Sequence, residues 1–343
     1  MKIHLHIGTH KTGTSAIQTL ASRDRKFLLE HGIYTPMPDG QGLPRGVMTE
    51  VAVMLKRGRY AEVKAFFDQW VAEAEQASAR LLFVSSEEFS TAAHSHVEAL
   101  ARMLEPYDTQ VILYLRNVHE FAISLCGELI KKPGGGRRYD KLVHNVTRRL
   151  NYTQLVSNWE TAFGAEGLDL RCYDLERNAL IETFYAGLGV PEDALCDLVA
   201  NRSFLKNKSI DMATQMMLSA AGINSDMKML GRSNDMYESA FSGVSFTPPR
   251  LPDIARMFCR PEFLDFSHAR LAPFVELLSR PIPEVEISGE MQAEYLERLG
   301  IFALGLAAER RGRRPWTERL RMFLKAGRAA TRTPQKPRRT GKR

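Results

Sequence analysis

The sequence has little that would cross-link the chain or hold it in a membrane. Its 343 residues contain no run of about 18 apolar residues, the length that a helix needs to span a bilayer. The four cysteines, Cys126, Cys172, Cys196 and Cys259, form no Cys-x-x-Cys pair, which argues against a disulfide framework and a zinc site. The N-terminus lacks the charged start and apolar stretch of a signal peptide. We therefore expect a soluble, cytoplasmic protein with free thiols.

Negative charge is nearly absent from the C-terminal end. Residues 310–343 hold fourteen Lys or Arg and one acid, Glu318, a net charge of +13. Because the whole chain carries +7, residues 1–309 carry −6. The basic character therefore belongs to a tail, and the acidic body argues against nucleic-acid binding by the folded domain.

The tail, residues 312–343, begins with an amphipathic piece and is expected to end in disorder. Trp316, Leu320, Phe323 and Leu324 follow helical spacing and have arginines around them. Such a stripe suits an interfacial helix at the inner face of an anionic membrane. A plain solvated tail and a nucleic-acid or ribosome contact are the alternatives.

Strand and helix patterns alternate through the first half of the chain, which is typical of an α/β fold with a parallel sheet covered by helices. Helices and long loops follow from about residue 176, and 223–250 is a candidate substrate-capping segment. We expect one domain over 1–311, with an α/β core at 1–190 and a helical part at 191–311. The predicted strands are Lys2–Ile7, Ile33–Thr35, Leu81–Ser85, Val111–Leu115 and Leu168–Tyr173. The predicted helices are Thr14–Gly32, 47–57, 60–78, Asn117–Lys132, 152–163 and 289–311.

The first predicted strand runs directly into the loop Gly8-Thr9-His10-Lys11-Thr12-Gly13-Thr14-Ser15. Two glycines let the backbone curl so that several N–H groups point at one spot, and the following helix adds the positive end of its dipole. A Walker A loop would carry lysine where Thr14 stands, whereas here Lys11 lies inside the loop. The pattern predicts a phosphate or sulfate site in a P-loop-like fold.

Acidic residues follow the predicted strand Leu81–Ser85, in the run Ser86-Glu87-Glu88-Phe89. Ligands of open α/β sheets bind at the carboxyl ends of strands, so a carboxylate here could orient a metal or act as a general base. Alternatively, Ser86 caps a short helix, Phe89 packs inward, and the acids favour the helix start.

Arg116 follows a third strand, and Ser124 lies eight residues later on a predicted helix. An arginine and a hydroxyl that converge on one point can hold a second phosphate. Taken singly, each is more often a surface or packing residue.

Together these features resemble the PAPS-dependent sulfotransferases, in particular bacterial carbohydrate-sulfotransferase-like proteins. The resemblance covers about residues 1–190 and includes the Ser-Ser-Glu-Glu-Phe segment and residues 152–189. It implies that Arg116 and Ser124 hold the 3′-phosphate of PAPS. The loop residues that it assigns to the 5′-phosphosulfate are Lys11, Thr12, Gly13, Thr14 and Ser15, with His10 as a further contact of the donor or a packing residue.

The resemblance also implies the chemistry: a sulfuryl group passes from PAPS to a hydroxyl or amine of an acceptor, for which a carbohydrate or glycolipid is expected. Lys11 would neutralise the leaving phosphate without a metal ion. Glu87 is the favoured general base and Glu88 the second choice. A histidine is the other type of base, but His94, His96 and His119 read more simply as surface residues.

Other functions stay open on the sequence alone. A Mg²⁺-dependent P-loop kinase would use Glu87 as an unusual metal-orienting acid, although the missing Gly-Lys-[ST] counts against it. A non-catalytic nucleotide-binding adaptor at a membrane would keep the fold and bind the donor without transfer. Arg137 and Arg138 could meet an anionic acceptor or lie in a solvated loop.

Overall fold

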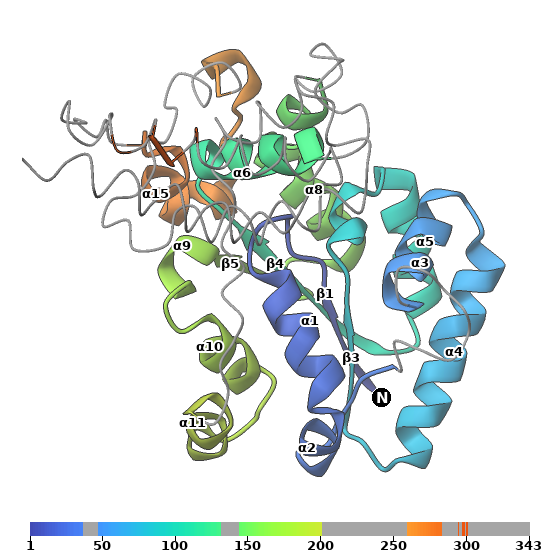
Figure 1. Cartoon of the computed structure of the whole chain (residues 1–343). Helices are drawn as coiled ribbons and strands as arrows, with labels where there is room; N and C mark the ends of the chain where they lie inside the picture. Colours follow the sequence, from blue (N-terminus) through green and yellow to red (C-terminus); the bar gives the residue numbers. More distant parts are fainter. Residues whose placement is uncertain are drawn as a thin grey trace, which may run out of the picture. The chain divides into compact units, whose positions relative to one another are not determined.

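A five-stranded parallel sheet forms the centre of the fold (Figure 1). The computed structural model describes residues 1–36, 47–131, 144–200 and 259–282, together with 294, 297, 298 and 300. The strands lie in the order β2-β3-β1-β4-β5, and each neighbouring pair is parallel. The α/β class that the sequence predicts is therefore confirmed. The strands are β1 (Lys2–His6), β2 (Ile33–Tyr34), β3 (Leu81–Ser85), β4 (Asp108–Leu115) and β5 (Leu168–Cys172).

Nearly all of these residues belong to one compact unit, made of 1–129, 138–207 and 251–283. A second unit, made of 130–137, 208–250 and 284–343, falls almost wholly outside the described residues. The domain boundaries expected at 190 and 311 stay predictions. Several predicted features lie outside the described residues: Arg137 and Arg138, the segment 223–250, the helix 289–311 and the tail 312–343.

Helices cover both faces of the sheet (Figure 1). On one face, α1 and α10 pack on β3 and β4 through a buried cluster that includes Ile17, Phe83, Tyr114 and Phe184. On the other, α4 packs against β3 and α8 against β4, while α5 contacts both helices. The helices are α1 (Thr14–Arg23), α2 (Arg25–Glu30), α3 (Val47–Lys56), α4 (Tyr60–Gln76), α5 (His94–Leu104), α6 (Val118–Lys131), α8 (Tyr152–Phe163), α9 (Tyr173–Glu176), α10 (Leu180–Gly187), α11 (Glu192–Ala200) and α15 (Val275–Ser279). The 3₁₀ helices are η1 (Glu87–Thr91), η4 (Pro261–Phe263) and η5 (Ala269–Phe274).

The strand order decides which loops meet. β1 lies between β3 and β4, so the chain segments that follow these three strands leave the same edge of the sheet side by side. The pairing continues past the strand ends, because Ile7 N–H donates to Ile112 O at 3.0 Å and Ser86 N–H to His6 O at 3.0 Å. Ligands of open α/β sheets bind at such an edge, where successive crossovers go to opposite sides.

The predicted helix Thr14–Gly32 is wrong as a single element, because it breaks at Asp24 into α1 and α2. Asp24 is buried and leaves helical geometry at φ −110° and ψ 28°. Its carbonyl accepts from Leu28 N–H at 2.9 Å, which starts the second helix. Short polar residues such as aspartate favour helix ends over helix interiors.

Helix α5 has no counterpart in the sequence prediction. Its apolar residues Val97, Leu100 and Leu104 are buried at helical spacing. Ala93 precedes it, however, with no side chain to cap the helix, and its first turn holds no acid. A start signal is therefore missing from the sequence. Strand β4 also begins earlier than predicted, at Asp108, because polar residues at its start pair with β1.

Candidate functional site

The loop between β1 and α1 has a backbone shape that gathers N–H groups. Lys11 and Gly13 both have positive φ, 67° and 75°. Lysine seldom adopts this left-handed conformation, and such strained residues cluster at functional sites. Within α1, the N–H groups of Ala16 and Ile17 both donate to Gly13 O. The N–H groups of Thr14 and Ser15 precede them in the first turn, where a helix offers no backbone acceptor.

Two buried threonines hold the loop in place. The backbone N–H and the hydroxyl of Thr9 both donate to Tyr114 O in β4, at 3.2 and 3.0 Å. The Thr12 hydroxyl donates to Thr9 O at 2.6 Å. Two of the loop residues predicted to bind the 5′-phosphosulfate are thus placed: Thr12 uses its side chain to shape the loop, and the side chain of Ser15 is exposed.

The Thr14 hydroxyl faces the start of the loop. It is buried, and within the described residues it has no hydrogen-bond partner. A Cβ added to Gly8 would lie 3.2 Å from this hydroxyl and 2.7 Å from Nε2 of His6, so only glycine fits there. His6 is wholly buried, and burial lowers the pKa of its imidazole to about 3, which keeps the ring neutral at physiological pH.

Arg116 connects the ends of β1 and β4. Its Nη1 donates to Lys11 O at 2.8 Å, and its Nη2 lies 2.6 Å from Glu120 Oε2. The guanidinium also lies over the ring of Tyr173, 5.2 Å from the centroid. Tyr152 fixes the backbone, because its hydroxyl donates to Arg116 O at 2.7 Å. The sequence grouped the loop and Arg116 in one site, and the structure brings them into direct contact.

Helix α6 presents an acidic face to these cations. Asn117 caps it, accepting from the N–H groups of His119 and Glu120. Glu120 contacts Arg116, and Glu128 lies 3.0 Å from the ammonium of Lys11. Ser124 stands four residues from each, so helical geometry puts it on the same face. Sequence reasoning missed both glutamates, although their spacing around Ser124 was a usable signal.

Glu87 and Glu88 lie in η1, at the end of β3. Ser86 caps this helix by accepting from Glu88 N–H at 3.3 Å, and Phe89 is wholly buried, as the sequence suggested. Glu87 Oε2 accepts from the amide of Gln18 in α1 at 3.3 Å. The two carboxylates therefore start from one short helix but have different surroundings.

Glu88 instead pairs with Lys56 of α3. Burial raises the pKa of its carboxyl, but the hydrogen bond and charge of Lys56 oppose burial, and the pKa lies below its usual range. The charges of His10 and Arg149 act in the same direction. A carboxylate stabilised in this way is a weak base.

The other predicted histidines take part in contacts between or within helices. His94 lies 3.2 Å from Glu98 one turn along α5, and His96 contacts the hydroxyl of Tyr60 at 2.8 Å. His119 is half-buried in the first turn of α6, and burial lowers its pKa. His10, by contrast, is buried beside the site and lines a cavity.

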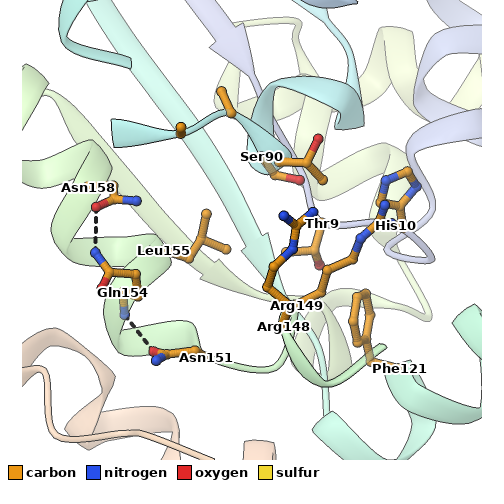
Figure 2. A pocket seen from close by; sticks show the side chains of 13 residues that line it. Thr9, His10, Ser90, Phe121, Arg148, Arg149, Asn151, Gln154, Leu155 and Asn158 are labelled. Carbon is orange, nitrogen blue, oxygen red and sulfur yellow. Dashed lines mark hydrogen bonds between the residues drawn. The ribbon is translucent and has the colours of Figure 1, made fainter. Parts of the chain in front are cut away.

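That cavity of about 250 Å³ lies between the first half of the loop, η1 and the start of α8 (Figure 2). Thr9 and His10 line it on one side with Ser90 above them, the polar face of α8 lies opposite, and Arg148 and Arg149 stand between. Lys56 of α3 donates to the hydroxyl of Thr91, one of the lining residues, at 2.8 Å. The sequence could not show this contact, because α3 and η1 are far apart in the chain.

The described residues also bear on thiols, membrane-spanning helices and metal sites. All four cysteines are free thiols, and only Cys196 is exposed. Within the described part of the chain, no helix is long and apolar enough to cross a membrane. The same part contains no group of three or more His, Cys, Asp or Glu side chains placed to hold a metal ion.

The fold is similar to the solved structure of a sulfotransferase from Alicyclobacillus acidocaldarius. The two chains are 15% identical, the alignment covers 68% of this chain and 95% of the other, and the TM-score is 0.37. The sequence matches no known protein family and no curated protein. The function of this chain therefore has to be inferred from its own site.

Gly13→Ala is expected to destabilise the protein strongly. A Cβ at this position would lie 2.1 Å from Cδ2 of the buried Leu180, and the backbone has φ +75°. The left-handed backbone costs about 1–2 kcal/mol and overpacking about 1–3 kcal/mol, which corresponds to a fall in Tm of about 5–15 °C.

Gly58→Ala is the matched control, because Gly58 has φ +72° with nothing within 4 Å of the added Cβ. It should lose only the backbone contribution of about 1–2 kcal/mol. Equal losses of Tm in the two variants, measured by thermal denaturation, would show that the contact of the loop with α10 has no energetic weight.

Proposed function

We propose that this chain is a PAPS-dependent sulfotransferase that acts on a hydroxyl or amine of a carbohydrate or glycolipid. One observation carries the proposal: Arg116, at the end of β4, donates to the backbone of the loop that follows β1, and Glu87 lies at the end of the neighbouring strand β3. The cations Lys11 and Arg116 and the carboxylate of Glu87 thus share one edge of the sheet. This arrangement suits a donor with two separate anionic groups and an acceptor that must lose a proton.

The loop supports the binding of the donor's 5′-phosphosulfate. Its backbone N–H groups, from His10 to Ser15, belong to a turn with two positive φ values and to a helix start, both of which favour anions. The Thr14 hydroxyl, which has no hydrogen-bond partner within the described residues, adds a donor. Arg116 and Ser124 are the proposed contacts of the 3′-phosphate.

Donor binding would exchange one set of anions for another. Glu128 contacts Lys11, and Glu120 contacts Arg116. Phosphate groups that replace these carboxylates keep both cations neutralised, so binding need not leave a buried charge uncompensated. The acids of α6 hold the two cations at the site until then.

PAPS supplies the sulfuryl group, which passes to the acceptor oxygen as the bond between sulfur and the 5′-phosphate oxygen breaks. Lys11 neutralises the negative charge that develops on the leaving phosphate, and the N–H groups of the loop share this work. Glu87 takes the proton from the acceptor hydroxyl. Positioning and charge stabilisation account for most of the rate in such transfers.

Glu87 is the proposed base, and Glu88 is not, because of the different partners of the two carboxylates. A neutral amide, Gln18, contacts Glu87, whereas the ammonium of Lys56 contacts Glu88 and lowers its pKa. The contact with Gln18 also places Glu87 beside the second turn of α1, close to the helix start that forms the anion site.

Binding of the donor is tested by the thermal shift of the full chain with 3′-phosphoadenosine 5′-phosphate (PAP), the product of PAPS. At about 100 times Kd, PAP should stabilise the fold by about 2.7 kcal/mol, a rise in Tm of several degrees. ATP, with and without Mg²⁺, is the control. A rise with Mg²⁺·ATP but not with PAP would identify a kinase instead.

Transfer itself separates an enzyme from an adaptor. Incubation with PAPS labelled in its sulfate and with a panel of glycans and glycolipids should give a labelled product. Binding of PAP without transfer to any acceptor would favour the non-catalytic adaptor.

A further inference from the structure

The cavity beside the loop has a wall made of side-chain amides. Asn151 Oδ1 accepts from the backbone N–H of Gln154 at 2.8 Å, and Gln154 Nε2 donates to Asn158 Oδ1 at 2.7 Å. These residues follow one face of α8, and Figure 2 shows them in a row. The bonds fix the amides in place and leave further donors and acceptors of the row for a ligand. A row of oriented amides suits a molecule with several hydroxyl groups.

Phe121 and the loop form the opposite side. Phe121 is buried in α6, and its ring lines the cavity beside His10 (Figure 2). Small-molecule sites combine apolar or aromatic walls with a few fixed polar groups, and their volumes start near 300 Å³. The cavity of about 250 Å³ lies just below this range, so it has room for one small ring and no larger ligand.

Two arginines stand between the amide row and His10 (Figure 2). Arg148 is exposed and Arg149 half-buried, and within the described residues Nε of Arg149 has no hydrogen-bond partner. Burial lowers the pKa of the Arg149 guanidinium, although the charge of Glu88 opposes this shift. An anionic ligand would stabilise such a partly desolvated cation, because it offsets the charge and accepts the unused hydrogen bond.

The nearby acids do not serve as the anionic partner of Arg149. Glu88 and Glu128 both act on Arg149 through their charge. Each already contacts a lysine, Lys56 and Lys11 respectively. With both acids paired, Arg148 and Arg149 leave a surplus of positive charge beside the amide row. When the donor phosphate displaces Glu128 from Lys11, Glu128 can offset only one of these two charges.

We propose that this cavity binds the acceptor, and that the acceptor is an acidic sugar whose carboxylate or sulfate contacts Arg148 and Arg149. The inference rests on the proposed sulfotransferase function and adds a substrate class to it. The sugar hydroxyls contact Asn151, Gln154 and Asn158. Thr9 and His10 belong to both the cavity and the anion-binding loop, so a ring held here lies next to the donor site.

The test uses the full chain and two matched probes, glucuronic acid and glucose, which differ at the carboxylate. Their affinities are measured by calorimetric titration with and without saturating PAP. The wild type should bind glucuronic acid more tightly than glucose. Arg149→Gln should weaken glucuronic acid by about 10- to 100-fold, the effect of removing a charged hydrogen-bond partner, and leave glucose unchanged. Arg148→Gln should weaken glucuronic acid by about two- to fivefold and leave glucose unchanged, because Arg148 is exposed.

Arg59→Gln is the control for loss of one positive charge, because Arg59 is exposed at the start of α4 and pairs with Glu62. It should change neither sugar affinity. If Arg149→Gln fails to fold, the exposed Arg148 carries the test.

Equal affinity of the wild type for the two sugars, or full affinity for glucuronic acid in both variants, would overturn the inference. So would a tenfold loss of PAP affinity in Arg149→Gln, which would move Arg149 to the donor site. Failure of PAP to bind the wild type, with the preference for glucuronic acid retained, would contradict the proposed function and leave the cavity as a site for acidic sugars.

Discussion

Glu87→Gln is expected to lower kcat for sulfuryl transfer by about 10²- to 10⁴-fold, the usual contribution of a general base. The amide keeps the size of the side chain and can still contact Gln18, but it cannot take the proton from the acceptor. The affinity for PAP should stay within about twofold, because Glu87 does not hold the donor. The measurement is transfer of labelled sulfate at saturating PAPS, together with a PAP titration of the same preparation.

Glu88→Gln is the matched control, since it makes the same change one residue along η1. It removes the charged partner of Lys56 and leaves the hydrogen bond from Lys56 to Thr91, so Tm should fall while kcat falls much less than in Glu87→Gln. The reverse order of kcat values would assign the base to Glu88. Normal kcat in both variants would require a base of another type, and His10, the buried histidine of the loop, would be the first to replace.

Arg116→Ala is expected to weaken PAP by about 30-fold or more, because truncating one partner of a buried charge pair costs about 2–5 kcal/mol. The loss has two sources. The 3′-phosphate loses a cationic contact, and the loop loses the hydrogen bond from Nη1 to Lys11 O. Arg116→Lys should recover only part of the affinity, because an ammonium cannot contact Lys11 O and Glu120 with a planar fork. Calorimetric titration with PAP measures both variants.

Arg177→Ala is the control for removing a cation that pairs with Glu120, the acidic partner of Arg116. Arg177 also lies near Glu120, with 3.8 Å between Nη1 and Oε1, but its side chain is 49% exposed and, within the described residues, makes no hydrogen bond to the backbone of the loop. Its loss should change PAP affinity by less than about threefold, as expected for an exposed ion pair. Similar losses in Arg116→Ala and Arg177→Ala would mean that the general charge of this region, and not the position of Arg116, governs binding.

Local signals were enough to predict the backbone features around the candidate site. Two glycines around Lys11, directly after an apolar strand, predict a turn with positive φ and a helix start, and the structure has both. Ser86 and Phe89 predict a capped short helix, which is η1. Asn117, which follows Arg116, predicts the start of α6. Each of these features depends on a few residues that are adjacent in the chain, so a short stretch of sequence is enough to predict it.

Signals that depend on distant neighbours were not readable. The break at Asp24 lies inside a helical pattern, and α5 begins at Ala93 without a capping side chain. The polar start of β4, Asp108 to Gln110, is a strand only because β1 lies beside it. Tertiary pairing overrides local propensity at such positions.

The sequence by itself therefore determined the α/β class, the curled backbone of the loop, and the presence of Arg116 and Glu87 after strands. Only the tertiary structure decided that β1 lies between β3 and β4, which brings these groups to one edge. It also decided that Glu120 and Glu128 hold the two cations, and that Arg149 meets the cavity beside His10. The reason is physical: loop and helix starts follow from adjacent backbone and side-chain groups, whereas strand order and ion pairs follow from packing between segments far apart in the chain.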